Sequence, residues 1–242
     1  MNNYRQTISP NELSPSRFAK TAWMLGLFGI LCILVGCTDS DSETFSDVDV
    51  VGRNVNPEGI AYPSDDWGMR PIRGKTRGQR LPNLSFSGYP KSNVADGLKI
   101  VSFADYYDPN QLHSKLLIVV GVSLYCPHCQ AETRAIVASD NTLRRAGVEI
   151  IEVAFEGSVR GRSLVLKDVN NWVDKMNTGF TVVIDAAAKR FVDYATIDAV
   201  PWNVRVDPRS MEVLSIEPGE LLDFDLYAEQ GLSWIATHDP RP

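Results

Sequence analysis

An apolar run followed at once by two closely spaced cysteines constrains the fold of this chain more than any other feature. Residues 116–124, LLIVVGVSL, form a continuous β-branched run that is typical of a strand buried on both faces. Cys126-Pro127-His128-Cys129 comes directly afterwards, and residues 128–146 then follow a helical pattern that Gly147 can end. We therefore expect a buried strand, a turn holding both cysteines, and a helix.

The residues beyond this segment continue to alternate between strand and helix signals. Residues 148–155 and 180–184 predict buried strands, and residues 163–176 predict a helix with Ser163 as its N-cap. The remaining predicted elements are a short helix over 186–194, a hairpin of 202–206 and 211–216 turning at 207–210, and a C-terminal helix over 221–235. This order predicts one α/β domain over residues 78–242, with helices on both faces of a mixed sheet.

The spacing of Cys126 and Cys129 gives the predicted turn a specific chemistry. Two cysteines three residues apart at a helix start bring their sulfurs close enough to bridge. The helix dipole and the unpaired N–H groups favour a thiolate at Cys126, which is the attacking species in disulfide exchange. Pro127 suits the first helical turn, because its missing N–H would have no partner there. His128 adds a donor and, when protonated, a positive charge beside Cys126.

Two other uses of the cysteine pair stay open from the residues alone. A structural zinc site needs four ligands, and the other histidines, His113 and His238, are distant in sequence. A purely structural disulfide would close too small a loop to stabilise the fold much. We expect redox chemistry that needs no metal and no cofactor.

Several segments in order resemble the thioredoxin fold, specifically the redoxin and TlpA-like thiol–disulfide oxidoreductases that bacteria export. Besides the cysteine tetrad, the similar segments are residues 78–86 (GQRLPNLSF), 99–103 (KIVSF), 180–185 (FTVVID) and 199–203 (AVPWN). The resemblance implies a three-layer α/β/α domain with a mixed central sheet. It also implies that Pro201 is cis and faces the cysteines, leaving the backbone of Val200 free to pair with an extended substrate.

The resemblance further implies an activity and its partners. It implies a thiol–disulfide oxidoreductase that acts on exported proteins with cysteines or disulfides, and that a separate redox partner recharges. Cys126, Cys129, Pro127, His128, Pro201 and Glu132 are the residues expected to carry the reaction, with Glu132 matching an acidic position common in the exported members.

Val120 departs from the family pattern. Thioredoxin has a buried acid six residues before the first cysteine, where it helps to deprotonate the second thiol. Proton transfer at Cys129 would here need Glu132 or water, unless Glu132 is simply an exposed helix residue. His128 predicts a more oxidising pair than that of thioredoxin, because a stabilised thiolate stabilises the reduced form.

Two alternative functions share this fold. In a peroxiredoxin-like peroxidase, Ser123 would occupy the hydroxyl position three residues before the first cysteine, but Val119 stands where that family has a proline. A non-enzymatic copper-binding protein would need a histidine far downstream, for which His238 is the candidate, at an unsuitable spacing.

The first 36 residues predict a lipoprotein signal peptide. Residues 21–36 are an uncharged apolar run after a basic stretch, and Leu34-Val35-Gly36-Cys37 resembles a lipobox, in which Cys37 is lipidated and Cys32 is removed. A short uncleaved anchor is the alternative. Both interpretations place the chain in the cell envelope, facing the periplasm, and Asp39 lies one place too late for an inner-membrane retention signal, which favours the outer membrane.

Residues 37–77 predict a lipidated, disordered tether, because the segment is acidic at first and then dense in proline and glycine. A docking segment built on Tyr62 and Trp67 is the alternative. The formal net charge of −6 and the absence of any Lys/Arg-rich stretch argue against nucleic acid as a partner.

Overall fold

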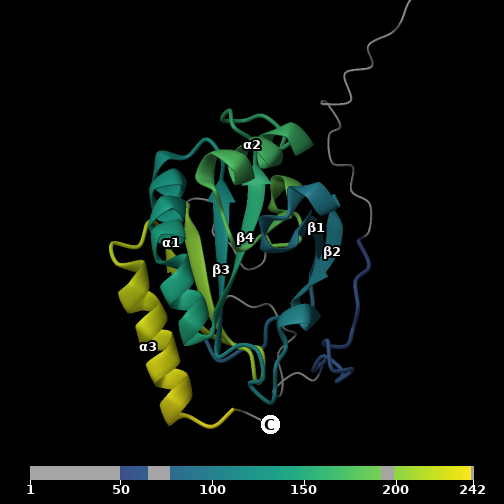
Figure 1. The fold of residues 1–242 in the computed structure, drawn as a ribbon, viewed down its shortest axis with the longest axis vertical. Helices are drawn as coiled ribbons and strands as arrows, with labels where there is room; N and C mark the ends of the chain where they lie inside the picture. The colour runs from purple at the N-terminus through teal and green to yellow at the C-terminus, as the bar shows by residue number, and fades with distance from the viewer. Residues whose placement is uncertain (1–49, 65–76, 192–198, 241–242) are drawn as a thin grey trace, which may run out of the picture. The chain divides into compact units, whose positions relative to one another are not determined.

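The computed structural model describes residues 50–64, 77–191 and 199–240 (Figure 1). Its seven strands form one sheet in the order β2-β1-β5-β4-β3-β6-β7. The strands are β1 (Ser85–Tyr89), β2 (Lys99–Ser102), β3 (Leu116–Ser123), β4 (Val148–Glu156), β5 (Thr181–Ile184), β6 (Trp202–Asp207) and β7 (Glu212–Pro218). The α-helices are α1 (Pro127–Ala146), α2 (Leu166–Met176) and α3 (Phe224–Thr237), and short 3-10 turns include η4 (Phe103–Tyr106) and η5 (Ala186–Ala188).

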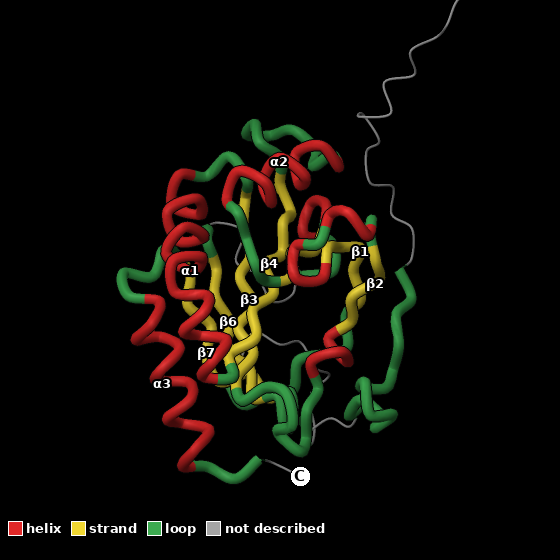
Figure 2. The backbone as a smooth tube through the Cα atoms, in the orientation of Figure 1, coloured by secondary structure: helices red, strands yellow, loops and turns green. Residues whose placement is uncertain are grey.

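Strand β3 organises the sheet, and every one of its residues is buried. It pairs in parallel with β4 and antiparallel with β6, and β7 lies on the far side of β6 (Figure 2). β5 continues the parallel part, whereas β1, β2 and β7 pair antiparallel with their neighbours. A β3–α1–β4 unit is thus followed, further along the chain, by the β6–β7 hairpin and α3. The fold is thioredoxin-like, which confirms the predicted mixed-sheet α/β class.

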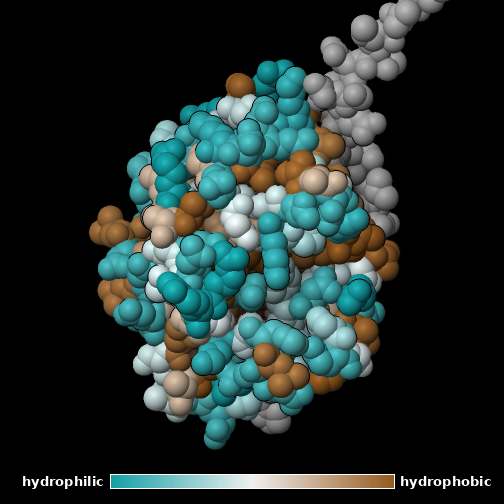
Figure 3. Space-filling model, viewed as in Figure 1, coloured by the Kyte–Doolittle hydropathy of each residue, from teal (hydrophilic) through white to brown (hydrophobic). Residues whose placement is uncertain are grey.

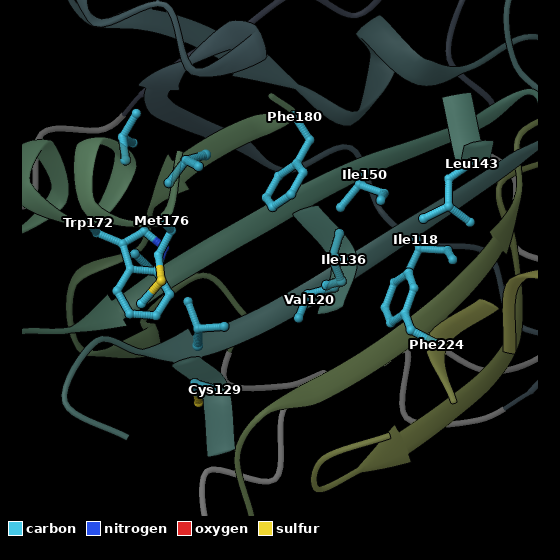
Figure 4. Packing of buried hydrophobic residues seen from close by; sticks show 14 of the residues in the cluster. Ile118, Val120, Cys129, Ile136, Leu143, Ile150, Trp172, Met176, Phe180 and Phe224 are labelled. Carbon is cyan, nitrogen blue, oxygen red and sulfur yellow. The ribbon is translucent and has the colours of Figure 1, made fainter. Parts of the chain in front are cut away.

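Two clusters of apolar side chains fill the faces of the sheet. On one face, Ile118 and Val120 belong to a cluster that includes Ile136 of α1, Trp172 of α2 and Phe224 of α3 (Figure 4). α1 and α3 contact each other and lie side by side in front of the sheet (Figure 1). The opposite face is covered by Tyr62, Leu81, Phe103, Ala104 and Phe191. Over the described residues, turns and loops thus form this second layer, in which α-helix had been expected.

The predicted elements on either side of the cysteines are confirmed. α1 begins at Pro127 and ends at Gly147, which adopts the left-handed conformation (φ 87°) that glycine tolerates best. Its last turn carries Arg144 and Arg145, whose charges suit the negative end of the helix dipole.

Three predicted helices have other boundaries in the structure, and carboxylates rather than the periodic pattern set the starts of two of them. α2 begins at Leu166 and not at Ser163, and the Val165 N–H donates to the Asp168 carboxylate at 3.4 Å. α3 begins at Phe224, where the Asp223 carboxylate accepts from the Leu226 N–H at 2.8 Å. A helix was expected over 186–194. The structure has the short η5 (Ala186–Ala188) and then a turn as far as residue 191, and residues 192–194 lie outside the described residues.

Residues 50–64 differ from the predicted disordered tether, because they pack against the domain. Tyr62 is buried, its hydroxyl donates to the Leu81 carbonyl at 2.5 Å, and its ring lies edge-on to that of Tyr107. The Asn56 side chain donates to the Tyr107 carbonyl at 3.0 Å. Single well-placed side chains hold this segment, and such anchors leave no periodic signal in the sequence. We call residues 50–64 the N-terminal strap.

The predicted signal peptide, Cys32, Cys37 and Trp67 lie outside the described residues. Within the described ranges, no helix has the length and apolar character needed to span a bilayer. The face in Figure 3 is mainly hydrophilic, with separate small apolar patches.

Candidate redox site

Cys126 and Cys129 lie at the junction between β3 and α1. The Cys126 N–H donates to the Ser123 carbonyl at 3.0 Å, and the Gln130 side chain donates to the Leu124 carbonyl at 3.1 Å, so the turn is held at both ends. Cys126 is the N-cap residue of α1 and is 7% exposed, whereas Cys129 is 0% exposed one turn further in. Both thiols are free in this structure. Both cysteines therefore lie in the turn that the sequence predicted between a buried strand and a helix.

Pro201 lies opposite the cysteines. The Val200–Pro201 peptide bond is cis, and the Cys126 Sγ lies 3.8 Å from the Val200 carbonyl oxygen. The Pro201 carbonyl accepts from the Gly219 N–H at 2.7 Å, which ties this loop to the end of β7. The cis peptide bond that the resemblance implied for Pro201 is therefore present, and it lies next to Cys126.

His128 has a partner that the sequence did not indicate. Its Nδ1 lies 2.6 Å from an Oε2 atom of Glu220, in the loop between β7 and α3. Both side chains are partly exposed, so the ion pair formed when the ring is protonated is only weakly stabilising. The carboxylate nevertheless places a negative charge beside the positive charge that was expected to act on Cys126.

Cys129 is surrounded by the apolar cluster of Figure 4, at the end of α1 nearest the turn. Burial raises the pKa of its thiol far above the ordinary value, and Cys126 and Glu152 raise it further, against a lowering effect of the Ser123 backbone. Cys129 is therefore a thiol rather than a thiolate when the pair is reduced. It can attack a disulfide only if its proton is taken up as it reacts.

Glu132 is buried, so the alternative of an exposed helix residue is wrong. One carboxylate oxygen accepts from the Leu221 N–H at 2.6 Å, which turns the side chain toward the segment before α3. Burial raises the pKa of Glu132 to about 7, although the Leu221 and Asn203 contacts act in the opposite direction. The group can therefore exchange a proton near neutral pH.

Glu152 is a second buried carboxyl, and the sequence analysis missed it. It lies on β4, has no exposed surface, and accepts hydrogen bonds from Thr133 Oγ1 at 2.5 Å and Trp172 Nε1 at 2.6 Å. Burial raises its pKa to about 7. The available signal was Glu152 in VEIIEVAF, where it lies between Ile151 and Val153 of a strand expected to be buried, a place where an unpaired charge is costly.

The residues of the two alternative functions have other roles. The Ser123 hydroxyl is buried and donates to a Glu156 carboxylate oxygen at 2.6 Å. The His238 ring stacks on that of Trp234, and the backbone carbonyl of His238 accepts a hydrogen bond from the Arg209 side chain. Arg209 lies in the turn of the β6–β7 hairpin, at the end of β6 opposite to Pro201. Among the described residues, no three histidine, cysteine or carboxylate side chains are grouped closely enough to bind a metal ion.

No family model matches the chain, and no curated protein matches it. Solved structures do. They include a thiol:disulfide interchange protein of the thioredoxin family from Chlorobium tepidum TLS (20% identity, 65% of this chain and 98% of that chain, TM-score 0.48). The thioredoxin domain of a thiol-disulfide oxidoreductase from Bacteroides vulgatus is also similar (18%, 66% and 98%, TM-score 0.49).

A third similar structure is the pneumococcal exposed lipoprotein thioredoxin of Streptococcus pneumoniae strain TIGR4 (17% identity, 63% of this chain and 99% of that chain, TM-score 0.45). The strand order and connections described above, rather than these similarities, establish the fold.

Proposed function

We propose that this protein is a thiol–disulfide oxidoreductase that acts through Cys126 and Cys129. One observation carries the proposal. A more accessible and a fully buried cysteine lie one turn apart at the start of α1, with the backbone of Val200 3.8 Å from the first sulfur. This arrangement gives one thiol to meet a substrate and a second to complete the exchange.

The reaction follows from the unequal positions of the two thiols. The Cys126 thiolate attacks one sulfur of a substrate disulfide, forms a mixed disulfide, and releases the other substrate sulfur as a thiolate that takes up a proton. Cys129 then loses its proton and attacks the Cys126 sulfur, which releases the second substrate thiol and leaves a Cys126–Cys129 disulfide. Two electrons pass to the substrate, and the reverse sequence oxidises a substrate dithiol.

The proposal includes the location of the protein. Leu34-Val35-Gly36-Cys37 supports export and attachment to a membrane of the cell envelope through a lipid on Cys37. The substrates are then exported proteins with cysteines or disulfides, reached from the membrane surface. Glu132 is proposed to tune proton exchange near the pair, and Pro201 to shape the substrate site.

Reduction of insulin disulfides with dithiothreitol as the electron donor tests the activity. Wild-type protein should accelerate the reaction and Cys126→Ser should not, because the attacking thiol is lost. Consumption of hydrogen peroxide is measured in parallel. A wild-type protein that consumes peroxide catalytically but does not accelerate the reduction of insulin would overturn the proposal in favour of a peroxidase.

A further inference from the structure

Glu152 is a completely buried carboxyl group. Over the described part of the chain, no lysine, arginine or histidine forms an ion pair with it. An isolated buried carboxylate is expensive, so a group of this kind is retained at a cost in stability. The residues around Glu152 indicate what role such a buried carboxyl group can have.

The position of Glu152 is fixed relative to Cys129 by three elements. In the parallel pairing of β3 and β4, Glu152 lies opposite Val120, which belongs to the same cluster as Cys129. Thr133, whose hydroxyl donates to Glu152, lies four residues after Cys129 on α1, and residues at this spacing are neighbours on one helix face. Trp172 of α2 holds the other carboxylate oxygen. The carboxyl group therefore lies beneath the first turns of α1.

The groups around Glu152 are acidic, neutral or apolar. α1 contributes Cys129, Thr133 and Glu132, whose pKa the charge of Glu152 raises. α2 contributes Trp172, and β3 contributes Val120. The negative charge of Glu152 also raises the pKa of the Cys129 thiol. Cys129 and Glu152 thus compete for charge, and a proton on one of them favours the ionised form of the other.

We propose that Glu152, acting through the hydroxyl of Thr133, takes up the proton that Cys129 loses when it attacks the mixed disulfide. This inference rests on the proposed function and assigns to a residue of β4 the proton transfer that was expected of Glu132 or water. The Cys129 S–H bond breaks as Thr133 Oγ1 accepts its proton, and the proton already on that hydroxyl passes to Glu152. The Cys129 sulfur forms its bond to Cys126, and the protonated carboxyl later returns the proton to solvent. Glu152 is a positioning residue in this scheme, because Thr133 stands between it and the reacting sulfur.

Glu132 is less suited to this step. Its bonded oxygen is directed to the Leu221 N–H, on the side of α1 that faces α3. Of these two carboxyl groups, Glu152 is the one whose negative charge raises the pKa of the Cys129 thiol.

The two thiols can be followed separately with one equivalent of dithiobis(nitrobenzoate) on the reduced mature protein, in which Cys32 is removed and Cys37 is lipidated. Attack by Cys126 releases a first coloured thiolate in a bimolecular phase, and attack by Cys129 releases a second in a unimolecular phase. In the wild type, the second phase should accelerate as pH rises through an inflection near 7, where Glu152 becomes able to accept a proton. Glu152→Gln should lose this inflection and slow the second phase by about tenfold or more, with the first phase changed by less than about twofold.

Three further variants sharpen the test. Glu152→Asp should retain the inflection, and Glu149→Gln, the same substitution elsewhere on β4, should change neither phase. If Glu152→Gln does not fold, Thr133→Val decides, because it removes the relaying hydroxyl at nearly constant volume and should slow the second phase alone. An unchanged second phase and pH profile in Glu152→Gln, or in Thr133→Val where that variant decides, overturns the inference. A wild-type protein without the first phase overturns the proposed function itself.

Discussion

Cys126 and Cys129 have the same functional group, but their positions in the fold make the two thiols chemically unequal. Cys126 caps α1 beside the Val200 backbone, whereas Cys129 has no exposed surface and burial raises the pKa of its thiol. A substrate disulfide can reach only the first of them without opening the structure. Cys126 should therefore attack substrates and Cys129 should resolve the mixed disulfide.

Substitution of each cysteine tests this division of roles. Cys129→Ser should accumulate mixed disulfides between Cys126 and envelope proteins, because no thiol remains to release them. Cys126→Ser should trap little. Non-reducing gels followed by mass spectrometry of the adducts make the comparison, and adducts that form mainly through Cys129 would reverse the assignment.

His128 and Glu220 together set the charge near Cys126. The positive charge of a protonated His128 ring and the negative charge of the Glu220 carboxylate, 2.6 Å away, nearly cancel. Removal of the ring alone therefore leaves a net negative charge near the Cys126 thiolate. His128→Gly should therefore destabilise the reduced form and lower the reduction potential. Because both groups are partly exposed, the change should stay below about 30 mV, the equivalent of one pKa unit in a two-electron couple.

The double variant His128→Gly, Glu220→Gln is the matched control for this effect. It removes both charges, so its potential should return close to that of the wild type. Glutathione equilibria of the three proteins measure the difference. Equal potentials in the wild type and His128→Gly would show that the histidine has no electrostatic effect on the pair.

The N-terminal strap contributes to the stability of the domain, and this contribution can be tested with two substitutions. Tyr62 contributes a buried ring and a hydrogen bond to Leu81, whereas Val51 of the same segment is 78% exposed. Tyr62→Ala should lower the free energy of unfolding by about 3 kcal/mol, and Val51→Ala by less than about 0.5 kcal/mol. Chemical denaturation of both variants provides the measurement, and equal losses would mean that the strap does not pack on the domain in solution.

The elements that the sequence predicts best are those with strong periodicity or a local motif. β3, β4 and α1 follow from apolar runs, from Pro127 and from Gly147, and their order places the two cysteines correctly. The strap depends on single contacts, such as that of Tyr62 with Leu81, and these two residues are 19 positions apart in the sequence.

The carboxyl groups of the site show the same limit. Glu132 was named from its spacing to Cys129, but its burial depends on α3 and the Leu221 loop. Glu220 is 92 positions from His128, and Glu152 is 19 positions from Thr133. These contacts exist only once the sheet and its helices are assembled, so the sequence indicates the thiols of the site and not the acids around them.

The molecule as a whole combines this domain with a chain start that predicts attachment to a membrane. We expect the mature protein to begin at a lipidated Cys37, because this cysteine directly follows a 16-residue apolar run that ends in Leu34-Val35-Gly36. The intact mass of the protein extracted from membranes tests this expectation. An unprocessed Met1 terminus, or a Cys37→Ala form that is still cleaved and anchored, would contradict it.

The account depends above all on reversible oxidation of one pair of thiols. Equilibration of the purified protein with mixtures of reduced and oxidised glutathione, followed by acid quenching and thiol alkylation, measures this directly. We predict a single two-electron transition between a dithiol and an intramolecular Cys126–Cys129 disulfide, absent from Cys126→Ser and from Cys129→Ser. Cysteines that remain reduced under all mixtures, or that oxidise without returning to the dithiol, would contradict the account.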